Sequence, residues 1–158
     1  MNGTRPLLSR RQLQALSGAA CGRTSREIGR ELGISDRTAA NYLCLTGEKL
    51  GVRRRAAMVD AAYRLGLLAR PDRPPAAAPR TTPRRLQVLR LMAAGLSDRE
   101  IAAELYTSPG TVMSHAAQLY ADLGARSRAH AVAIGHQYGL LGAEDPAATA
   151  RTGAAAVP

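Results

Sequence analysis

Hydroxyl and guanidinium side chains that can bind phosphate recur at a regular spacing in this sequence. They fall into two similar sets, which are Ser25, Arg26, Ser35 and Thr38, and then Ser97, Arg99, Ser108 and Thr111. Hydroxyls at helix N-termini bind phosphate together with backbone N–H groups, and arginine adds positive charge. Because the same hydroxyls are also needed as helix caps, they indicate a phosphate-binding protein only in company with the charge of the chain.

The charge of the chain favours an anionic partner. Lysine and arginine number 22 against 12 aspartate and glutamate, a formal net charge of +10. Most of the excess lies in residues 1–68, with twelve basic and five acidic side chains, whereas residues 82–158 hold seven and six. A basic surface can serve solubility alone, but together with the hydroxyls it predicts nucleic-acid binding. We expect the run Arg53, Arg54 and Arg55 to supply much of this attraction.

Side chains that could catalyse a reaction or hold a metal are few and scattered. The histidines, His115, His130 and His136, do not cluster with acids or cysteines in the sequence. Cys21 and Cys44 are too few and too far apart for a metal site, and we expect both to be buried and reduced. The sequence shows no glycine-rich loop that would cradle a phosphate. It therefore predicts a protein that is not an enzyme and uses no cofactor and no metal.

The second set of hydroxyls belongs to two short helices within residues 95–124. Ser97 is the expected N-cap of the first helix, and Glu100 completes a capping box. Ser108 caps the second helix, whose apolar residues follow helical spacing at Val112, Ala116, Leu119 and Leu123. Few residues separate the two helices, so they must cross steeply. This layout is a helix-turn-helix, in which the second helix presents its exposed face to the DNA major groove.

The whole unit occurs twice. Without a gap, a shift of 73 positions superimposes identical residues, which include Gly22 and Gly95, Glu27 and Glu100, Ile28 and Ile101, Ser35 and Ser108, and Leu68 and Leu141. Such a repeat indicates two copies of one structural unit. Because no segment alternates apolar and polar residues with period two, we expect an all-helical fold.

Each copy is predicted to contain four helices. They cover residues 9–20, 24–32, 35–50 and 54–65 in the first copy, and 83–94, 98–105, 109–123 and 128–138 in the second. The predicted domains are residues 5–68 and 82–141. Four prolines in residues 69–81 favour an extended linker with a reach of about 40 Å. Residues 142–158 are rich in Ala, Gly and Pro and are expected to be disordered.

Motifs in both copies resemble the LuxR-type, GerE-like helix-turn-helix domain of bacterial transcription regulators. In the second copy they are Thr82-Pro83-Arg84, Val88-Leu89-Arg90-Leu91, Ala93-Ala94-Gly95-Leu96-Ser97, Glu100-Ile101-Ala102, Thr111-Val112, Leu123-Gly124-Ala125 and Ala131-Val132. The resemblance implies a four-helix DNA-binding domain whose third helix enters the major groove and whose fourth often mediates dimerisation. Family members usually carry a sensor, receiver or ATPase domain before this unit. No such domain is visible in this sequence, which has tandem copies of the DNA-binding unit instead.

The groove-facing positions depart from the family pattern. A lysine that commonly follows the Thr-Val pair is replaced by Ala40 and Met113, and a basic residue one turn further on by Cys44 and Ala117. Arginine can pair with guanine, asparagine and glutamine with adenine, and methionine can pack on a thymine methyl group, although each position could equally be a solvated one. The candidate DNA-binding residues are Ser25, Arg26, Ser35, Arg37, Thr38, Ala40, Asn41, Cys44, Arg53, Arg54, Arg55, Ser97, Arg99, Ser108, Thr111, Met113, Ser114 and Gln118.

The favoured interpretation is a sequence-specific DNA-binding transcriptional regulator that uses its two units for adjacent half-sites of double-stranded DNA. Two alternatives stay open, a sigma-factor-like module that acts with RNA polymerase, and a protein-interaction module that has lost base reading. The alanine-rich fourth helices, at residues 56–62 and 129–133, permit close packing and therefore a homodimer. No export signal or membrane-spanning run is visible, so we expect a bacterial protein in the cytoplasm, associated with the nucleoid and not with a membrane.

Overall fold

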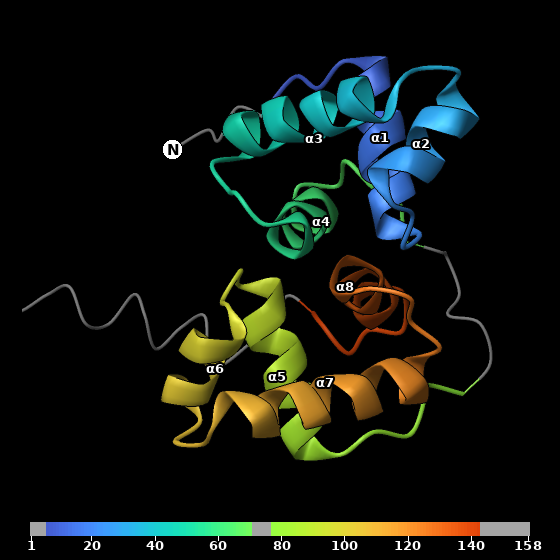
Figure 1. Ribbon diagram of the computed structural model, residues 1–158. Helices are drawn as coiled ribbons and strands as arrows, with labels where there is room; N and C mark the ends of the chain where they lie inside the picture. Colours follow the sequence, from blue (N-terminus) through green and yellow to red (C-terminus); the bar gives the residue numbers. More distant parts are fainter. Residues whose placement is uncertain (1–5, 71–76, 143–158) are drawn as a thin grey trace, which may run out of the picture.

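The computed structural model describes residues 6–70 and 77–142 (Figure 1). These parts of the chain form eight helices and contain no strand, so the all-helical prediction is confirmed. The first copy contains α1 (Arg10–Ala20), α2 (Ser25–Leu32), α3 (Asp36–Leu50) and α4 (Arg55–Arg64), and the second contains α5 (Pro83–Ala93), α6 (Asp98–Glu104), α7 (Pro109–Leu123) and α8 (Arg128–Gln137). The predicted disordered tail beyond residue 142 and residues 71–76 of the predicted linker lie outside the described residues. No helix in the described ranges is long and apolar enough to cross a membrane.

Hydroxyl side chains set where the helices begin. In every described helix except α4, a serine or threonine before the first turn accepts a backbone N–H from within that turn. Capping boxes, as predicted at Ser97 and Glu100, occur at α6 and also at α1 and α2. Gly33, Gly51 and Gly124 end α2, α3 and α7 in the left-handed conformation. These local signals explain why the predicted bounds agree with the observed helices to within one or two residues.

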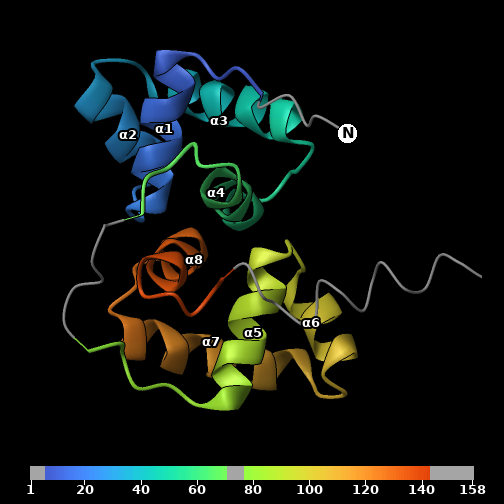
Figure 2. The same cartoon turned by 180° about the vertical axis from the view of Figure 1, so that it is seen from behind.

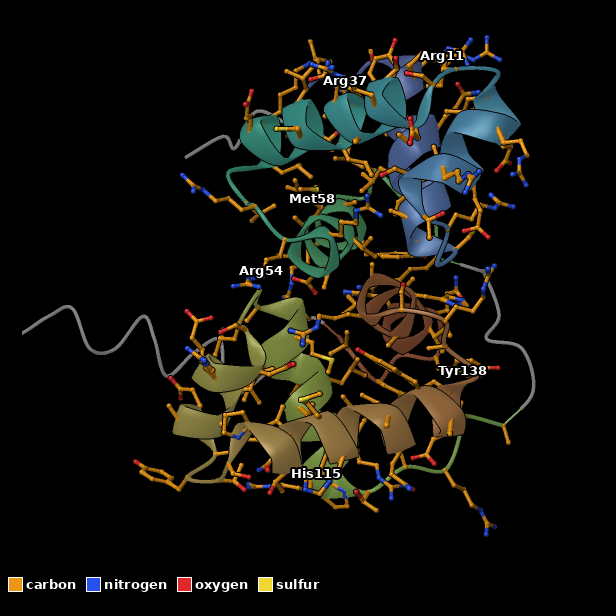
Figure 3. All side chains as sticks on the ribbon, in the orientation of Figure 1. Arg11, Arg37, Arg54, Met58, His115 and Tyr138 are labelled. Atoms are coloured by element: carbon orange, nitrogen blue, oxygen red, sulfur yellow. The ribbon has the colours of Figure 1, made fainter. Side chains whose placement is uncertain are left out.

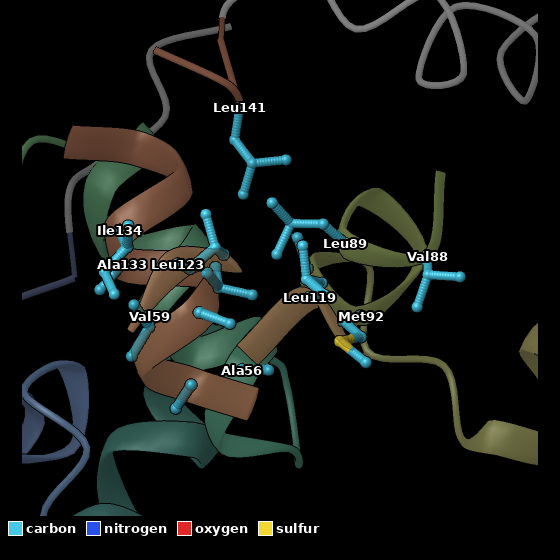
Figure 4. Packing of buried hydrophobic residues seen from close by; sticks show 14 of the residues in the cluster. Ala56, Val59, Val88, Leu89, Met92, Leu119, Leu123, Ala133, Ile134 and Leu141 are labelled. Carbon is cyan, nitrogen blue, oxygen red and sulfur yellow. The ribbon is translucent and has the colours of Figure 1, made fainter. Parts of the chain in front are cut away.

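The two copies pack together through their fourth helices. Figures 1 and 2 show α4 and α8 end-on and side by side at the centre, and in addition α1 packs on α8 and α5 on α4. One apolar cluster runs through both copies, from Ala56 and Val59 in α4 to Leu89, Met92 and Leu119 in the second copy (Figure 4). The first copy also has a small cluster of its own, around Ile28 and Leu43, so the shared cluster adds to the stability of units that are small by themselves.

The same packing occupies the surfaces that were expected to join two chains. Ala56, Ala57 and Ala62 on α4, and Ala129 and Ala133 on α8, are buried in the single chain. The small side chains therefore permit the close helix approach that was predicted, but the partner is the other copy of the same chain. A homodimer through the fourth helices would require this intramolecular contact to open.

The prediction that the two cysteines are buried is wrong. Cys21 and Cys44 are both exposed, and for Cys44 this agrees instead with its position on the groove-facing side of the predicted recognition helix. Gly47 in α3 would be read from helix propensity as a defect that costs about 1 kcal/mol. It is buried where α3 meets α4, and a Cβ at this position would lie 2.5 Å from the backbone oxygen of Val52. Glycine is therefore required there by packing, a constraint that helix periodicity does not reveal.

Candidate nucleic-acid interface

The helices predicted to enter the major groove, α3 and α7, lie on the same side of the molecule. In Figure 1, α3 passes in front of α1 and α7 in front of α5. In Figure 2, seen from behind, α1 and α5 are in front instead. α3 and α7 also stand at opposite ends of this side, with α4 and α8 between them. One duplex lying along this side could therefore meet both helices.

The helix α3 buries one stripe and exposes a polar one. Ala39, Leu43 and Thr46 are buried, while Figure 3 shows Arg37 on the outer side of the helix. The predicted contact residues on this helix that are exposed are Arg37, Ala40, Asn41 and Cys44. Within the described parts of the chain, the side chains of Arg37 and Asn41 have no hydrogen-bonding partner, so their polar groups are available to base edges.

The helix α7 presents a less polar face. Met113 is 60% exposed, and Ser114 and Gln118 are exposed beside it. The Ser114 hydroxyl donates to the backbone oxygen of Gly110 at 3.1 Å, and Gln118 Oε1 accepts from Arg85 Nη2 at 3.2 Å. Bidentate pairing with adenine needs both polar groups of glutamine. Gln118 therefore lies at the predicted position, and Arg85 competes with a base for one lone pair of its oxygen.

The N-termini of α3 and α7 have the same local geometry. Ser35 Oγ accepts the backbone N–H of Thr38 at 3.0 Å, and the two hydroxyl oxygens lie 2.7 Å apart. The corresponding distances between Ser108 and Thr111 are 3.1 Å and 2.9 Å. These hydroxyls order the first turn of each helix, whose exposed N–H groups can bind a phosphate. The repeated hydroxyls of the sequence thus cap the starts of both recognition helices with the same geometry, and the two helix starts stay equivalent candidates for phosphate binding.

The three consecutive arginines between α3 and α4 have different surroundings. Arg53 is exposed and has no ion pair or hydrogen bond with any residue that the structure describes. Arg54, labelled in Figure 3, lies 3.9 Å from the Glu100 carboxylate of the other copy. Arg55 is half-buried and donates to the Ser25 hydroxyl, so Ser25 is already engaged. Arg53 and the exposed Arg54, whose ion pair with Glu100 is a weak surface one, are therefore available to a phosphate, whereas Arg55 is engaged within the first copy.

The start of α2 carries a persistent negative charge. The cap residue is Thr24, whose backbone N–H and hydroxyl donate to the Glu27 carboxylate at 2.7 Å and 3.0 Å, and Arg126 of the second copy donates at 3.0 Å. These hydrogen bonds, those from Thr24 first, lower the pKa of Glu27 from 4.5 to about 2. Hydrogen bonds from Ser97 lower the pKa of Glu100 in the same way at α6. Because a carboxylate already occupies each of these helix ends, they are poorer phosphate sites than the starts of α3 and α7. Arg26 and Arg99, beside them, are exposed.

A pair of structural arginines was missed by sequence reasoning. Arg11 Nη1 donates to the backbone oxygen of Leu32 at 3.3 Å, and Arg84 Nη2 donates to that of Leu105 at 2.7 Å. Each bond holds the C-terminal end of the helix before a recognition helix. Arg11 and Arg84 are equivalent under the shift of 73 positions, so the repeat itself contained the signal. Part of the positive charge is therefore used inside the protein and not for DNA.

The protein has two four-helix units. In each unit a tight turn joins two helices, and the second of these helices is exposed on the same side of the molecule. This arrangement defines a helix-turn-helix protein. The family model for bacterial regulatory proteins of the luxR family matches residues 6–62 and 81–134, once in each copy. The chain belongs to this family of DNA-binding transcription regulators, as the motifs of both copies predicted.

Individual relatives match about one copy's length. A probable transcriptional regulatory protein NarL of Mycobacterium tuberculosis (strain ATCC 25618 / H37Rv) is 45% identical over 64 residues, which is 40% of this chain and 30% of the relative. A putative HTH-type transcriptional regulator of Mycobacterium bovis (strain ATCC BAA-935 / AF2122/97) is 45% identical over 51 residues, or 32% of this chain and 6% of the relative. The spore germination protein GerE of Bacillus subtilis (strain 168) is 34% identical over 65 residues, 41% of this chain and 88% of GerE. The chain thus spans less than a third of the length of the first two relatives. No solved structure matches it.

Proposed function

We propose that this protein is a sequence-specific transcriptional regulator that inserts α3 and α7 into two adjacent major-groove half-sites of one DNA duplex. The observation that carries the proposal is the exposure of both recognition helices on one side, at opposite ends, each with an ordered N-terminus beside its exposed stripe. A duplex on this side receives phosphate contacts at the starts of both helices and base contacts along them. Residues 5–68 and 82–141 act as the two DNA-binding domains, joined by the linker 69–81, and the site of action is the nucleoid in the cytoplasm.

The two copies divide the work unequally. The first copy exposes Arg26, Arg37 and Arg53 around its recognition helix, and Asn41 on it. The corresponding surface of the second copy carries Arg99 but no charged side chain among the contact candidates of α7. Phosphate contacts give most of the affinity of a DNA-binding protein, whereas base-edge contacts give its preference for a sequence. The first copy is therefore the principal anchor, and the second copy is a reader that relies on Met113, Ser114 and Gln118.

A second function has a specific observation in its favour. The weakly polar face of α7, with Met113 60% exposed, would suit contact with a protein such as RNA polymerase as well as contact with thymine methyl groups. In that case α3 alone would read DNA, and the second copy would act as an assembly surface.

Selection of the full-length chain on random double-stranded DNA separates these functions. Enrichment of a site with two conserved segments supports the proposed regulator, and one conserved segment supports a second copy that contacts protein. Enrichment only in the presence of RNA polymerase supports the promoter module. If no sequence is enriched under any of these conditions, the protein does not read DNA, and the proposal is wrong.

A further inference from the structure

The contacts between the two copies are related by an approximate two-fold axis. At Gly22, a Cβ would lie 3.0 Å from Nδ1 of His130, and at Gly95 a Cβ would lie 3.1 Å from that of Ala57. Gly22 and Gly95 are equivalent under the shift of 73 positions, and so are Ala57 and His130. The same contact therefore occurs in both directions. Reciprocal contacts of this kind define a two-fold interface and exclude a head-to-tail arrangement of the two copies.

At the two-fold axis, two residues at equivalent positions of the two copies contact each other. Tyr63 of α4 and His136 of α8 are related by the same shift of 73 positions. Their rings stack with centroids 4.9 Å apart and an interplanar angle of 13°. Equivalent residues of two units can touch each other only at a two-fold axis. The axis therefore runs between α4 and α8, midway between α3 and α7.

The polar side chains that meet at this axis are not repeated in the two copies, since the carboxylate comes only from α4 and the imidazole only from α8. Asp60 Oδ1 lies 2.7 Å from His136 Nε2, and Arg64 Nε donates to Asp60 Oδ2 at 2.7 Å. Arg70 Nη2 lies 3.0 Å from His136 Nδ1, and because arginine can only donate, Nδ1 is the acceptor. The Nε2–H of His136 therefore donates to Asp60. We call Asp60, Tyr63, Arg64, Arg70 and His136 the α4–α8 polar cluster.

The α4–α8 polar cluster favours pairing of α4 with α8 over pairing of two α4 helices or of two α8 helices. The position equivalent to Asp60 in α8 is Ala133, so the carboxylate occurs once. Two α4 helices would bring two carboxylates together, each left with Arg64 of its own helix but without its buried histidine partner, and two α8 helices would bury two histidines without a carboxylate. Burying a polar group without a partner costs free energy, so these pairings are disfavoured. The contact between Asp60 and His136 therefore helps to hold the two copies of one chain to each other.

We infer that one chain acts as a covalently joined heterodimer of reading units, and that its operator consists of two unlike half-sites in inverted orientation at one spacing. This inference rests on the proposed function and adds the orientation, the spacing and the number of chains. The two-fold axis turns α7 by half a turn relative to α3, so the two helices meet the duplex in opposite directions. The half-sites differ because α3 offers Arg37 and Asn41, whereas α7 offers Met113 and Ser114 at its exposed positions.

The test uses the full-length chain and duplexes built from the selected site. One duplex keeps the selected arrangement, a second has one half-site reversed in place, and a third has about half a helical turn of extra DNA between the halves. Loss of simultaneous engagement removes the gain from linked binding, so the second and third duplexes are expected to bind about 100-fold more weakly, at the level of a single half-site. Native mass spectrometry is expected to find one chain on the first duplex.

The outcomes separate this inference from the proposed function. If selection enriches no sequence, the proposed function fails and the inference fails with it. If it enriches half-sites in direct orientation, or at freely variable spacing, or identical half-sites that bind two chains, the protein is a DNA reader but the joined heterodimer is wrong. Equal affinity for the selected and the reversed duplex leads to the same conclusion.

A variant pair connects the spacing requirement to the α4–α8 polar cluster. Asp60→Ala combined with His136→Ala removes both members of the buried pair, and circular dichroism checks that the helices remain. The 100-fold preference for the selected spacing is expected to fall toward one, with unchanged affinity for a single half-site. Asp60→Asn, which keeps the shape of the side chain, serves for the same comparison if the double variant does not fold. A preference that survives in a folded variant would show that the cluster does not set the spacing.

Discussion

Replacing Gly47 with alanine tests how closely α3 and α4 pack. Alanine is the better helix former by about 1 kcal/mol, so local propensity predicts a more stable protein. A Cβ at Gly47 would lie 2.5 Å from the backbone oxygen of Val52 and 2.6 Å from Cε of Met58. The methyl group of Met58 can turn away, but Val52 is fixed because its N–H donates to the Gly47 oxygen at 2.9 Å. The end of α3 and the turn after it would therefore have to shift.

The size of the effect follows from the two opposing contributions. Over-packing of a buried site costs about 1–3 kcal/mol, and contact with a backbone atom places Gly47→Ala near the upper value. Subtracting the gain in helix propensity leaves a net loss of about 2 kcal/mol in the free energy of unfolding. For a chain of this length, such a loss lowers Tm by about 4–8 °C.

Urea unfolding and thermal unfolding, each followed by circular dichroism, measure this change. Gly110→Ala is the matched control because Gly110 lies in the first turn of α7, is exposed, and would place its Cβ no closer than 3.8 Å to a neighbouring atom. Its expected effect is a gain of about 0.4–1 kcal/mol. If Gly47→Ala stabilised the protein as Gly110→Ala does, the close approach of α3 and α4 would be wrong.

Three further predictions concern charge. Arg53→Gln is expected to reduce the slope of log affinity for DNA against log salt concentration by about 0.9, as measured by fluorescence-anisotropy titrations. Arg126→Gln, at the equivalent position but paired with Glu27, should leave this slope unchanged. Equal changes in the two variants would contradict the unequal roles of the copies. Met113→Lys adds a cation to the exposed face of α7 and should steepen the same slope by about one, and an unchanged slope would show that α7 does not face DNA. Because the pKa of Glu27 is lowered from 4.5 to about 2, its contribution to stability is present above pH 4.5 and is lost as the pH falls toward 2. Acid titrations of Glu27→Gln should therefore lose less stability across this range than the unmodified chain, and an unchanged acid profile would refute the charged capping box.

Helix bounds, the repeat and the family could be read from the sequence because their signals are local. A cap such as Ser35 acts on an N–H three residues away, and Gly124 ends α7 through its own backbone conformation. The buried stripe of Val112, Ala116, Leu119 and Leu123 follows from helical spacing alone, and all four residues are buried as that spacing predicts. The outward positions of the contact candidates on α3 and α7 follow from the same periodicity.

Other properties depended on residues far apart in the sequence. Asp60 and His136 are separated by 76 positions, and nothing in either segment indicates that they meet. The engagement of Arg54, Arg55 and Gln118 by other parts of the protein is of the same kind, since each partner lies on a different helix. Composition shows that these groups are charged or polar but not which of them remain available to DNA.

The sequence alone determined that each copy is an all-helical LuxR-type unit with a capped recognition helix, because capping and helical periodicity act over a few residues. Only the folded chain decided that the two copies face each other through α4 and α8, with α3 and α7 on one side. That choice depends on which apolar and polar surfaces match across the interface, and such matching is a property of side chains brought together in space.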